Sequence, residues 1–428
     1  GGTRRKARVA PPEWAGFRIK IIFMMRKTIL ILVCIGLFSP SIIAQRGKTN
    51  KPEAKKENEG YVFTPVVDLK TTSVKNQAST GTCWCFATIS FFESELLRMG
   101  KGEYDLSEMF IVRNNYLDRL KDNYLRQGKG NLGPGSLSHD VLKQFSEDGI
   151  VPEEVYSGLN YGSPTHNHGE LQAFINAVAA VPVQRKKESD QYRQIVNSIL
   201  DTYLGKVPET FTYKGVSYTP KSFAESLGIN PADYVEITSF THFPFYTQGL
   251  LEVPDNWTMG RFYNVPIDEL IEIMDYSLNK GFTIAWDGDV SEKGFSHTNG
   301  VATIPEVQRP ADMSVTDRAR LERLAQGNTQ SLTPEVPKPG PEASISQEIR
   351  QEGYESFLTT DDHLMHITGM VRDQNGVKYY KTKNSWGTDR NAFGGYLNMS
   401  ESYVRAKTMF ILVHKDAIPP AIRTKLGL

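Results

Sequence analysis

The chain has 428 residues, which is enough for two lobes packed around one cleft. It carries 49 Lys and Arg and 49 Asp and Glu residues, scattered along the sequence, so its formal net charge is zero. This balance argues against a nucleic-acid partner, which would require a basic excess.

Residues 24–44 have the layout of a secretory signal peptide. Basic residues precede an apolar run, and small or polar residues follow up to Ala44, after which we expect cleavage. The uninterrupted apolar run is shorter than the roughly 20 residues that span a bilayer, so no permanent membrane anchor is expected. Bulky Val33 precedes Cys34, and few apolar residues lie upstream, which argues against lipid anchoring at this cysteine. The sequence therefore predicts an exported protein, periplasmic or extracellular.

The fold is expected to begin well after the first residue. Residues 1–23 precede the first methionine and are set aside as an upstream extension. Residues 45–60 are charged and nearly free of apolar side chains, which predicts a flexible lead-in. We expect one folded region over 61–428. After removal of the signal peptide only Cys83 and Cys85 remain, so no structural disulfide framework is expected.

Helical patterns dominate the first part of the folded region. Over residues 82–99, apolar residues recur at three- and four-residue steps. Residues 105–120 predict a second helix with Ser107 or Asp105 as its cap. Residues 136–149 predict a third helix. These patterns indicate a helical lobe over about 71–160.

The middle of the chain is harder to interpret. Residues 161–265 are mixed in character, and we expect a large insertion there. A helix is predicted over 266–281, with Pro at its start and Gly just past its end, followed by a strand over 282–288. Residues 326–341 are rich in Pro and Gly, which predicts an exposed loop.

The last part of the chain consists of short apolar or aromatic runs separated by turn residues, as in an antiparallel sheet. The runs are residues 364–371, 378–386, 394–400 and 408–414. Together with the segment before them they indicate a β lobe over about 266–428. Helices early and strands late predict an α+β protein with two unlike lobes.

Two thiols flank a tryptophan in NQASTGTCWCF, and their places on the predicted helix distinguish them. Cys83 falls in the first turn, where unpaired backbone N–H groups and the helix dipole stabilise a thiolate. Cys85 lies about 200° further around the helix, so we expect it to be a small core residue. The C-W-C spacing does not fit the C-x-x-C redox motif, and no metal-ligand cluster accompanies it. No metal or cofactor is therefore expected.

A nucleophilic cysteine needs a base and a group that orients the base. DDHLMHITG places His363 and His366 at the head of a predicted strand, and they point to opposite faces because three is an odd separation. Asn384 lies 21 positions after His363, so one hairpin can bring the two side by side. The Asn384 carbonyl can accept an imidazole N–H and hold the ring toward the thiol.

VKNQASTGTCWCF, a DH pair six residues before a glycine, and KNSWG followed by GGY resemble the papain-like cysteine peptidases. The resemblance implies that Cys83 is the nucleophile, His363 the base and Asn384 the group that orients it. It also implies that Gln77, six residues before Cys83, donates to the oxyanion together with the Cys83 backbone N–H.

The same resemblance assigns further residues around these four. It implies that Trp386 shields the His–Asn hydrogen bond from water and that Trp386 and Gly135 belong to the substrate-binding site, with the GPGSL segment around Gly135 holding the substrate backbone. It leaves His366 with a structural role. His297 follows a different strand and lacks a downstream Asn-Ser-Trp, so we assign it to a loop. Thr80 stands where family members closest to papain have a disulfide-forming cysteine.

His363 follows Cys83 by 280 positions, against roughly 130–150 in compact family members. This length, and segments such as YNVPIDELIEIMDYSLNKGFTIAWDGDVS, resemble the bleomycin hydrolase and aminopeptidase C branch. The resemblance implies a papain-like two-lobed fold, with the nucleophile on the helical lobe and the His and Asn on an antiparallel sheet or barrel. It further implies a cysteine aminopeptidase that acts on peptides. A papain-like endopeptidase, an acyltransferase and an inactive peptide-binding homologue are the alternatives, and homo-oligomer formation is left open.

Two other motifs are set aside. GKGNLG matches the letters of a dinucleotide-binding motif, but it follows polar residues and Pro134 comes directly after it. His166 and His168 are close enough in sequence for a shared metal, together with Glu170. No further ligand cluster follows them, so we assign them to a polar loop.

Overall fold

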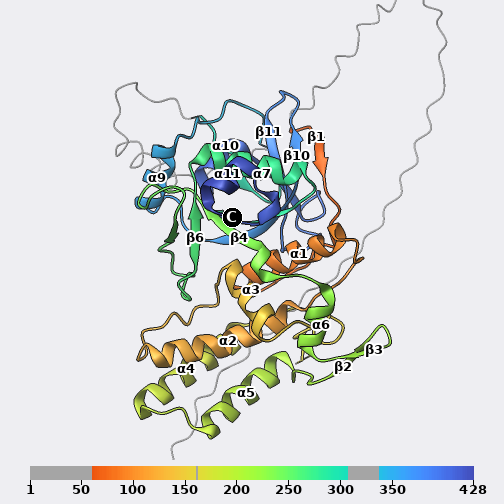
Figure 1. Ribbon diagram of the computed structural model, residues 1–428, viewed down its shortest axis with the longest axis vertical. Helices are drawn as coiled ribbons and strands as arrows, with labels where there is room; N and C mark the ends of the chain where they lie inside the picture. The colour runs from red at the N-terminus through yellow and green to blue at the C-terminus, as the bar shows by residue number, and fades with distance from the viewer. Residues whose placement is uncertain (1–59, 161, 307–336) are drawn as a thin grey trace, which may run out of the picture. The chain divides into compact units, whose positions relative to one another are not determined.

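The computed structural model describes residues 60–160, 162–306 and 337–428. The predicted signal peptide, Cys34 and most of the lead-in lie outside the described residues, as do residues 326–336 of the predicted Pro-rich loop. The described residues from 60 onward belong to a single compact unit, shown in Figure 1.

Helices come mostly from the first half of the described chain. They are α1 (Cys83–Arg98), α2 (Glu108–Leu125), α3 (Ser138–Glu147), α4 (Gly169–Arg185), α5 (Asp190–Leu204), α6 (Pro220–Leu227), α7 (Ile267–Asn279), α9 (Gln347–Glu355), α10 (Glu401–Lys407) and α11 (Pro420–Leu426), with short 3-10 helices η1 (Pro231–Asp233) and η2 (Lys415–Ala417). α4 packs against both α2 and α5, and α1 packs between α3 and the sheet (Figure 1). α1 is therefore the element that joins the helices to the strands.

Among the described residues, eleven strands form one mixed sheet. They are β1 (Thr64–Asp68), β4 (Tyr234–Thr238), β5 (Gln248–Leu250), β6 (Arg261–Asn264), β7 (Ile284–Gly288), β8 (Phe295–Ser296), β9 (Val301–Ala302), β10 (His363–Arg372), β11 (Lys378–Lys383), β12 (Tyr396–Ser400) and β13 (Thr408–His414). The order is β5-β6-β4-β13-β7-β10-β11-β12-β9-β8, with β1 on β10, while β2 (Phe211–Tyr213) and β3 (Val216–Tyr218) form a separate hairpin. The pairs β4–β6 and β12–β9 are parallel, and the other pairs are antiparallel.

The α+β prediction is confirmed, and most predicted elements exist near their expected bounds. Ser107 is the cap of α2, because its side chain accepts a hydrogen bond from the Phe110 backbone N–H. Three strands of the sheet, β4 to β6, come from the middle region that gave few signals. The short helix α10, between β12 and β13, was also not predicted.

The sheet separates two apolar clusters, because alternate residues of a strand face opposite sides. On β10, Leu364 packs in the cluster that includes the apolar side chains of α1. Met365 and Ile367 pack in the other cluster, with residues of α7 and α11. α1 and the C-terminal helix α11 therefore contribute to different clusters of the core.

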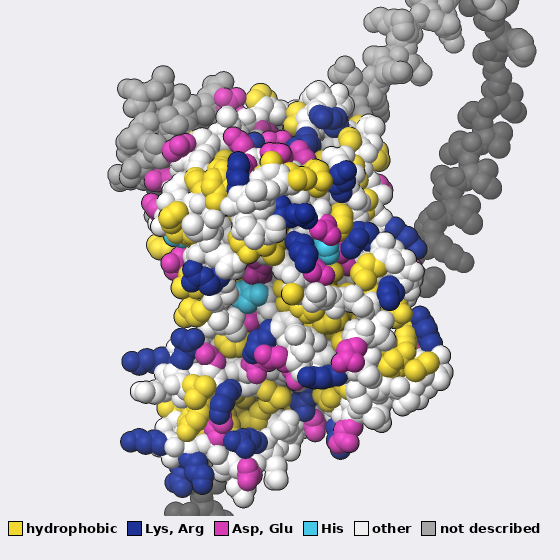
Figure 2. Space-filling model, viewed as in Figure 1, with side chains coloured by type: hydrophobic (Ala, Val, Ile, Leu, Met, Phe, Trp, Pro, Cys, Tyr) yellow, Lys and Arg dark blue, Asp and Glu magenta, His cyan; other side chains and the backbone are white. Residues whose placement is uncertain are grey.

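Charges of both signs cover the surface. Figure 2 shows Lys and Arg side chains interspersed with Asp and Glu over the visible face, in keeping with their equal numbers in the sequence. None of the described helices combines the length and the apolar character of a membrane-spanning segment.

Candidate active site

Cys83 is the first residue of α1, after a loop held by hydrogen bonds. The Thr80 hydroxyl donates to the Gln77 carbonyl at 2.8 Å, and the Ala78 backbone N–H donates to the Asn76 side chain at 2.9 Å. Thr80 is the position where close relatives of papain have a disulfide. Side-chain hydrogen bonds thus brace the segment that presents Cys83.

Gln77 joins this loop to the end of β11. Its backbone N–H donates to the Ser385 carbonyl at 2.8 Å, and its Oε1 accepts a hydrogen bond from the Ser385 hydroxyl at 2.6 Å. One N–H of its side-chain amide donates to the Thr80 carbonyl at 2.9 Å. Because a side-chain amide carries two N–H groups, the second is left for a ligand such as an oxyanion.

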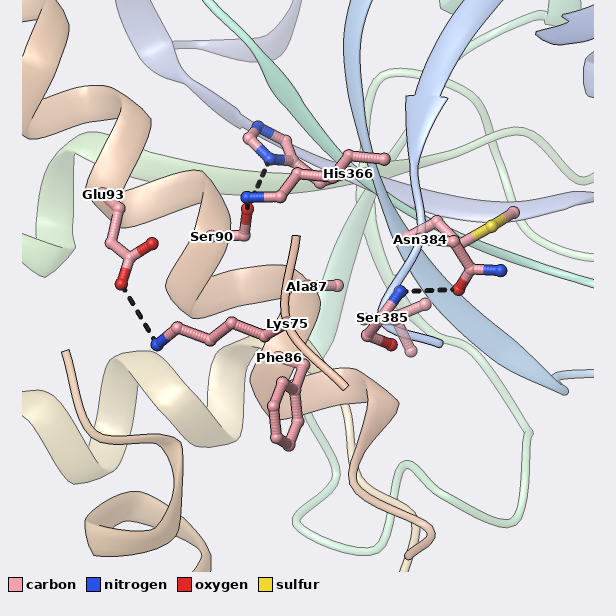
Figure 3. Close-up of a pocket in the computed structure, with 11 residues that line it drawn as sticks. Lys75, Phe86, Ala87, Ser90, Glu93, His366, Asn384 and Ser385 are labelled. Atoms are coloured by element: carbon pink, nitrogen blue, oxygen red, sulfur yellow. Dashed lines mark hydrogen bonds and ion pairs between the residues drawn. The ribbon is translucent and has the colours of Figure 1, made fainter. Parts of the chain in front are cut away.

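His363 and Asn384 lie side by side at the adjoining ends of antiparallel strands β10 and β11. His363 Nε2 is 2.8 Å from Asn384 Oδ1. The same oxygen accepts a hydrogen bond from the Ser385 backbone N–H at 2.7 Å (Figure 3). Since Oδ1 is an acceptor, Nε2 is the protonated nitrogen, and Nδ1 is left as the nitrogen that can take a proton. The Trp386 ring covers His363, with ring centroids 4.8 Å apart.

The Cys83 thiol reaches β10 beside His363. Its sulfur accepts a hydrogen bond from the backbone N–H of Leu364, the residue after His363. Burial raises the pKa of the Cys83 thiol to about 12, against the opposing effect of this hydrogen bond. Burial also lowers the pKa of His363 to about 4, although the bond to Asn384 opposes the shift. Burial therefore disfavours an isolated charge on either group.

Three carboxyl groups that sequence reasoning missed surround the thiol. Asp287, Asp361 and Asp255 each raise the pKa of Cys83 through their charge. Asp287 is fully buried on β7, where burial and the charge of the neighbouring Asp361 raise its pKa well above the ordinary value. Burial and the nearby Asp255 raise the pKa of Asp361 to about 7. The surroundings of the sulfur are therefore acidic, which no spacing motif in the sequence could reveal.

Gly135 lies beside one of these carboxyl groups. A Cβ atom at this position would overlap the Asp255 carboxylate, so only glycine fits against it. The Trp84 indole, from the first turn of α1, donates to the Pro134 carbonyl at 3.2 Å. The segment expected to hold substrate backbone is thus fastened both to the helix of Cys83 and to the loop of Asp255.

The other cysteine and the second histidine face the core. Cys85 is fully buried, and its thiol donates to the Glu108 carbonyl at 3.3 Å. His366 points to α1, where its Nδ1 is 2.9 Å from the Ser90 hydroxyl (Figure 3). Lys383 Nζ donates to the same hydroxyl at 2.8 Å. As predicted, His366 and His363 point in different directions.

A small cavity lies behind the site, between α1 and the ends of β10 and β11 (Figure 3). Its volume is about 20 Å³, enough for one water molecule. Its lining includes Ser90, His366, Lys383, Asn384 and Ser385. The cavity adjoins the residues that support the site and is too small for a peptide.

His297 lies in the loop between β8 and β9, as expected, but it also adjoins the site. Its Nδ1 is 3.3 Å from Asn384 Nδ2. Its ring meets Trp386 edge to face, with centroids 5.0 Å apart. The sequence assignment therefore missed this neighbour, because nothing in its spacing ties it to Asn384.

His166 and His168 flank the loop before Cys83. The Ser79 backbone bonds to both, donating to the His166 carbonyl and accepting from the His168 N–H, each at 3.1 Å. Both histidines are buried. In the described part of the chain, no group of three or more His, Cys, Asp or Glu side chains is arranged to hold a metal ion.

Family models match two parts of the chain. A model described as the papain family cysteine protease matches residues 66–253, and a model described as the Peptidase C1-like family matches residues 348–427. The first match contains Cys83 and the second contains His363 and Asn384. Together they contain all the proposed catalytic side chains.

Characterised relatives match most of the chain. Aminopeptidase C of Streptococcus thermophilus is 24% identical, over 85% of this chain and 84% of the relative. The mitochondrial Cysteine proteinase 1 of Saccharomyces cerevisiae is 21% identical, over 88% of this chain and 81% of the relative. The solved structure of PepW from Lactobacillus rhamnosis has the same fold, with a TM-score of 0.59 and 18% identity over 85% of this chain and 84% of that one. The chain is thus a papain-like cysteine peptidase of the branch that includes bleomycin hydrolase and aminopeptidase C.

Proposed function

We propose that this protein is an exported cysteine aminopeptidase, with Cys83 as nucleophile, His363 as base and Asn384 as the residue that orients the base. The arrangement of His363 carries the proposal. Its Nε2–H is held by Asn384 at 2.8 Å, and its backbone neighbour Leu364 binds the Cys83 sulfur. This leaves Nδ1 as the nitrogen that receives the thiol proton.

The proposed reaction begins with a proton transfer from Cys83 Sγ to His363 Nδ1. The sulfur then attacks the peptide carbonyl carbon, and the backbone N–H of Cys83 and the second N–H of the Gln77 amide stabilise the negative oxygen. His363 returns the proton to the leaving amine. Water, activated by His363, hydrolyses the thioester and releases the acid. Because burial disfavours each charge alone, thiolate and imidazolium form only as a pair.

Cleavage next to a free amine is supported by the names of the relatives and by the acidic surroundings of the thiol. Relatives at 24% and 21% identity are named aminopeptidase C and aminopeptidase W. Asp255, Asp287 and Asp361 lie near enough to influence the thiol. A substrate ammonium close to the scissile bond would interact favourably with the Asp255 carboxylate, whereas an internal peptide segment would not.

Hydrolysis of a free-amine peptide and its N-acetylated counterpart tests the proposal. We expect acetylation to lower kcat/KM at least about 30-fold, because it removes a charge that faces buried carboxylates. Cys83→Ala should lower activity at least about 1000-fold, as loss of a nucleophile does. Cys85→Ala is the matched control and should keep most of the activity, because Cys85 faces the core. Equal rates on the two peptides would favour an endopeptidase.

The Asp255→Asn variant, measured in the same assay, tests whether Asp255 interacts with the substrate ammonium. We choose Asp255 because its carboxylate lies against Gly135, where substrate backbone is expected, whereas Asp287 is fully buried. The variant should lower the ratio of kcat/KM for the free-amine peptide to kcat/KM for the acetylated peptide about tenfold or more. The rate on the acetylated peptide should stay unchanged. Asp268→Asn, on the outer end of α7, is the charge-matched control. An unchanged preference would exclude Asp255 as the counter-charge.

Export rests on the signal-peptide pattern of residues 24–44. The expected mature protein begins at Gln45, directly after the predicted cleavage at Ala44. N-terminal sequencing of the protein recovered from the periplasm or medium of a producing bacterium checks this. Recovery only from the cytoplasm, with the leader intact, would contradict export.

A further inference from the structure

His297 has no role in the reaction described above, yet its ring touches two groups that hold His363. Its Nδ1 is 3.3 Å from Asn384 Nδ2, and its ring packs edge to face on Trp386. Trp386 in turn covers His363. His297 is thus the next polar side chain after Asn384 in a chain of contacts that leads to the base.

The hydrogen bonds of the Asn384 amide determine which way the bond to His297 runs. Oδ1 accepts from the Ser385 backbone N–H at 2.7 Å, so the atom facing His363 is the oxygen. The atom facing His297 is therefore the amide nitrogen, which only donates. It follows that His297 Nδ1 is the acceptor and that His297 is neutral, with its proton on Nε2.

The backbone of His297 is held firmly enough to support this role. The Gly300 N–H donates to the His297 carbonyl at 3.0 Å, closing a tight turn, and the Asn391 side chain donates to the same carbonyl at 3.0 Å. Gly300 has a φ of +65°, and a Cβ there would overlap the Phe393 ring. The loop can therefore place the imidazole in one position.

The burial of His297 also costs folding free energy, and the proposed role would explain why the residue is a histidine. The residue is 8% exposed, and its Nε2 is buried without a hydrogen-bond partner among the described residues. An unpaired buried N–H costs about 1–3 kcal/mol, whereas an apolar ring of similar shape would avoid the cost. Burial and the nearby Arg390 lower the pKa of His297, which keeps it in the neutral form able to accept a hydrogen bond.

We propose that His297 is a positioning residue for the peptidase reaction: its Nδ1 holds the Asn384 amide so that the amide oxygen stays directed at His363. The inference rests on the proposed function of Cys83, His363 and Asn384. With the acceptor gone, the amide can rotate about its last side-chain bond, and the imidazole loses part of its alignment with the thiol. We expect the effect on kcat, because His297 is buried and contacts Asn384 and Trp386.

Two substitutions separate the acceptor from the space that the ring fills. His297→Phe keeps the ring and removes the acceptor, whereas His297→Asn places an amide oxygen near the position of Nδ1. We expect His297→Phe to lower kcat about three- to tenfold with KM within about twofold, and His297→Asn to retain at least about half of kcat. His242→Phe is the control, because His242 bonds to Glu252 and stacks on Tyr354 in another loop. It should leave kcat unchanged.

The same substitution in an Asn384→Ala background tests whether His297 acts through Asn384. There we expect His297→Phe to change kcat by less than about twofold, since the amide it would hold is absent. An equal loss in both backgrounds, a His297→Asn enzyme as slow as His297→Phe, or a His297→Phe enzyme with normal kcat would each overturn the inference. His297→Leu provides a second acceptor-free variant should His297→Phe fold poorly. Failure of the proposed function would give a different result, because the Cys83→Ala variant would then hydrolyse peptides at the wild-type rate.

Discussion

At the scale of single residues, the nucleophile and the base are each disfavoured as a lone ion. Burial raises the pKa of the Cys83 thiol to about 12 and lowers that of His363 to about 4. The charges of Asp287, Asp361 and Asp255 disfavour a thiolate further. Burial and the neighbouring charges therefore both oppose a lone thiolate, and a cationic substrate would offset the effect of the carboxyl groups.

The residues proposed as nucleophile, base and orienting group could be named from the sequence, whereas their neighbours in the structure could not. Cys83 is marked by its place at the start of a predicted helix and Asn384 by its hairpin distance from the histidines, whereas the choice of His363 over His366 came from the resemblance to the papain-like peptidases. Asp255 and His297 carry no such mark, because they reach the site through loops whose paths depend on the whole fold. Local periodicity predicts which face a residue occupies, but not which distant loop covers that face.

At the scale of elements, helix α3 and strand β4 are joined by a buried ion pair. His139 on α3 places its Nδ1 2.8 Å from Glu236 Oε2 on β4, and its backbone N–H donates to the same carboxylate at 2.9 Å. Burial alone lowers the pKa of His139, but the charge of Glu236 and the hydrogen bond to it outweigh this and raise the pKa to about 9. Thr258 holds the second ring nitrogen at 2.9 Å.

This pair predicts how stability depends on pH. Because the pKa of His139 is higher in the folded state than its ordinary 6.5, the stabilisation is complete below about pH 6.5 and is lost as pH rises through 9. We expect His139→Gln to lower the free energy of unfolding by at most about 3 kcal/mol at pH 6, and by much less at pH 9.5. Urea unfolding at the two pH values measures this.

The double variant His139→Gln with Glu236→Gln is the control for that measurement. This variant lacks both charges, so the titration of His139 cannot change its free energy of unfolding. The wild type should therefore lose stability relative to the double variant as pH rises from 6.5 to 9. A constant difference between wild type and His139→Gln across this range would mean that the imidazole is not charged in the folded protein.

The short elements that sequence reasoning missed share a physical cause, which does not apply to the longer helices α4 and α5. α10 has seven residues, too few for a clear helical period, and follows directly on β12. β5 and β6 have three and four residues, and they are strands because they pair in the sheet rather than through local propensity. Helix α1 was predicted correctly, but its burial was not. Its Glu93 and Glu95 fall between apolar positions, yet both are 1% exposed, because hydrogen bonds and salt bridges let a helix be buried on all sides.

At the scale of the whole molecule, the C-terminal helix lies on the opposite side of the sheet from α1. Ile422 and Leu426 of α11 are buried in the cluster that contains Met365 of β10, whereas α1 packs in the other cluster. Lys425 bonds to Glu269 of α7 at 2.6 Å. The tail therefore packs against α7, in a different apolar cluster from the helix that carries Cys83.

This placement predicts that the C-terminal carboxylate takes no part in specificity. Adding a neutral Gly-Ser-Gly-Ser extension after Leu428 should leave the preference for a free-amine peptide within about twofold of wild type, because the tail acts by packing. Leu426→Ala should instead lower the free energy of unfolding by about 2–4 kcal/mol, since it removes a buried side chain, and should spare the preference. The assay is the ratio of kcat/KM values for free and acetylated peptides, with thermal unfolding of each variant alongside. If the extension abolished the preference while Asp255→Asn kept it, the amine would be bound by the tail, and the carboxyl groups around Cys83 would need another explanation.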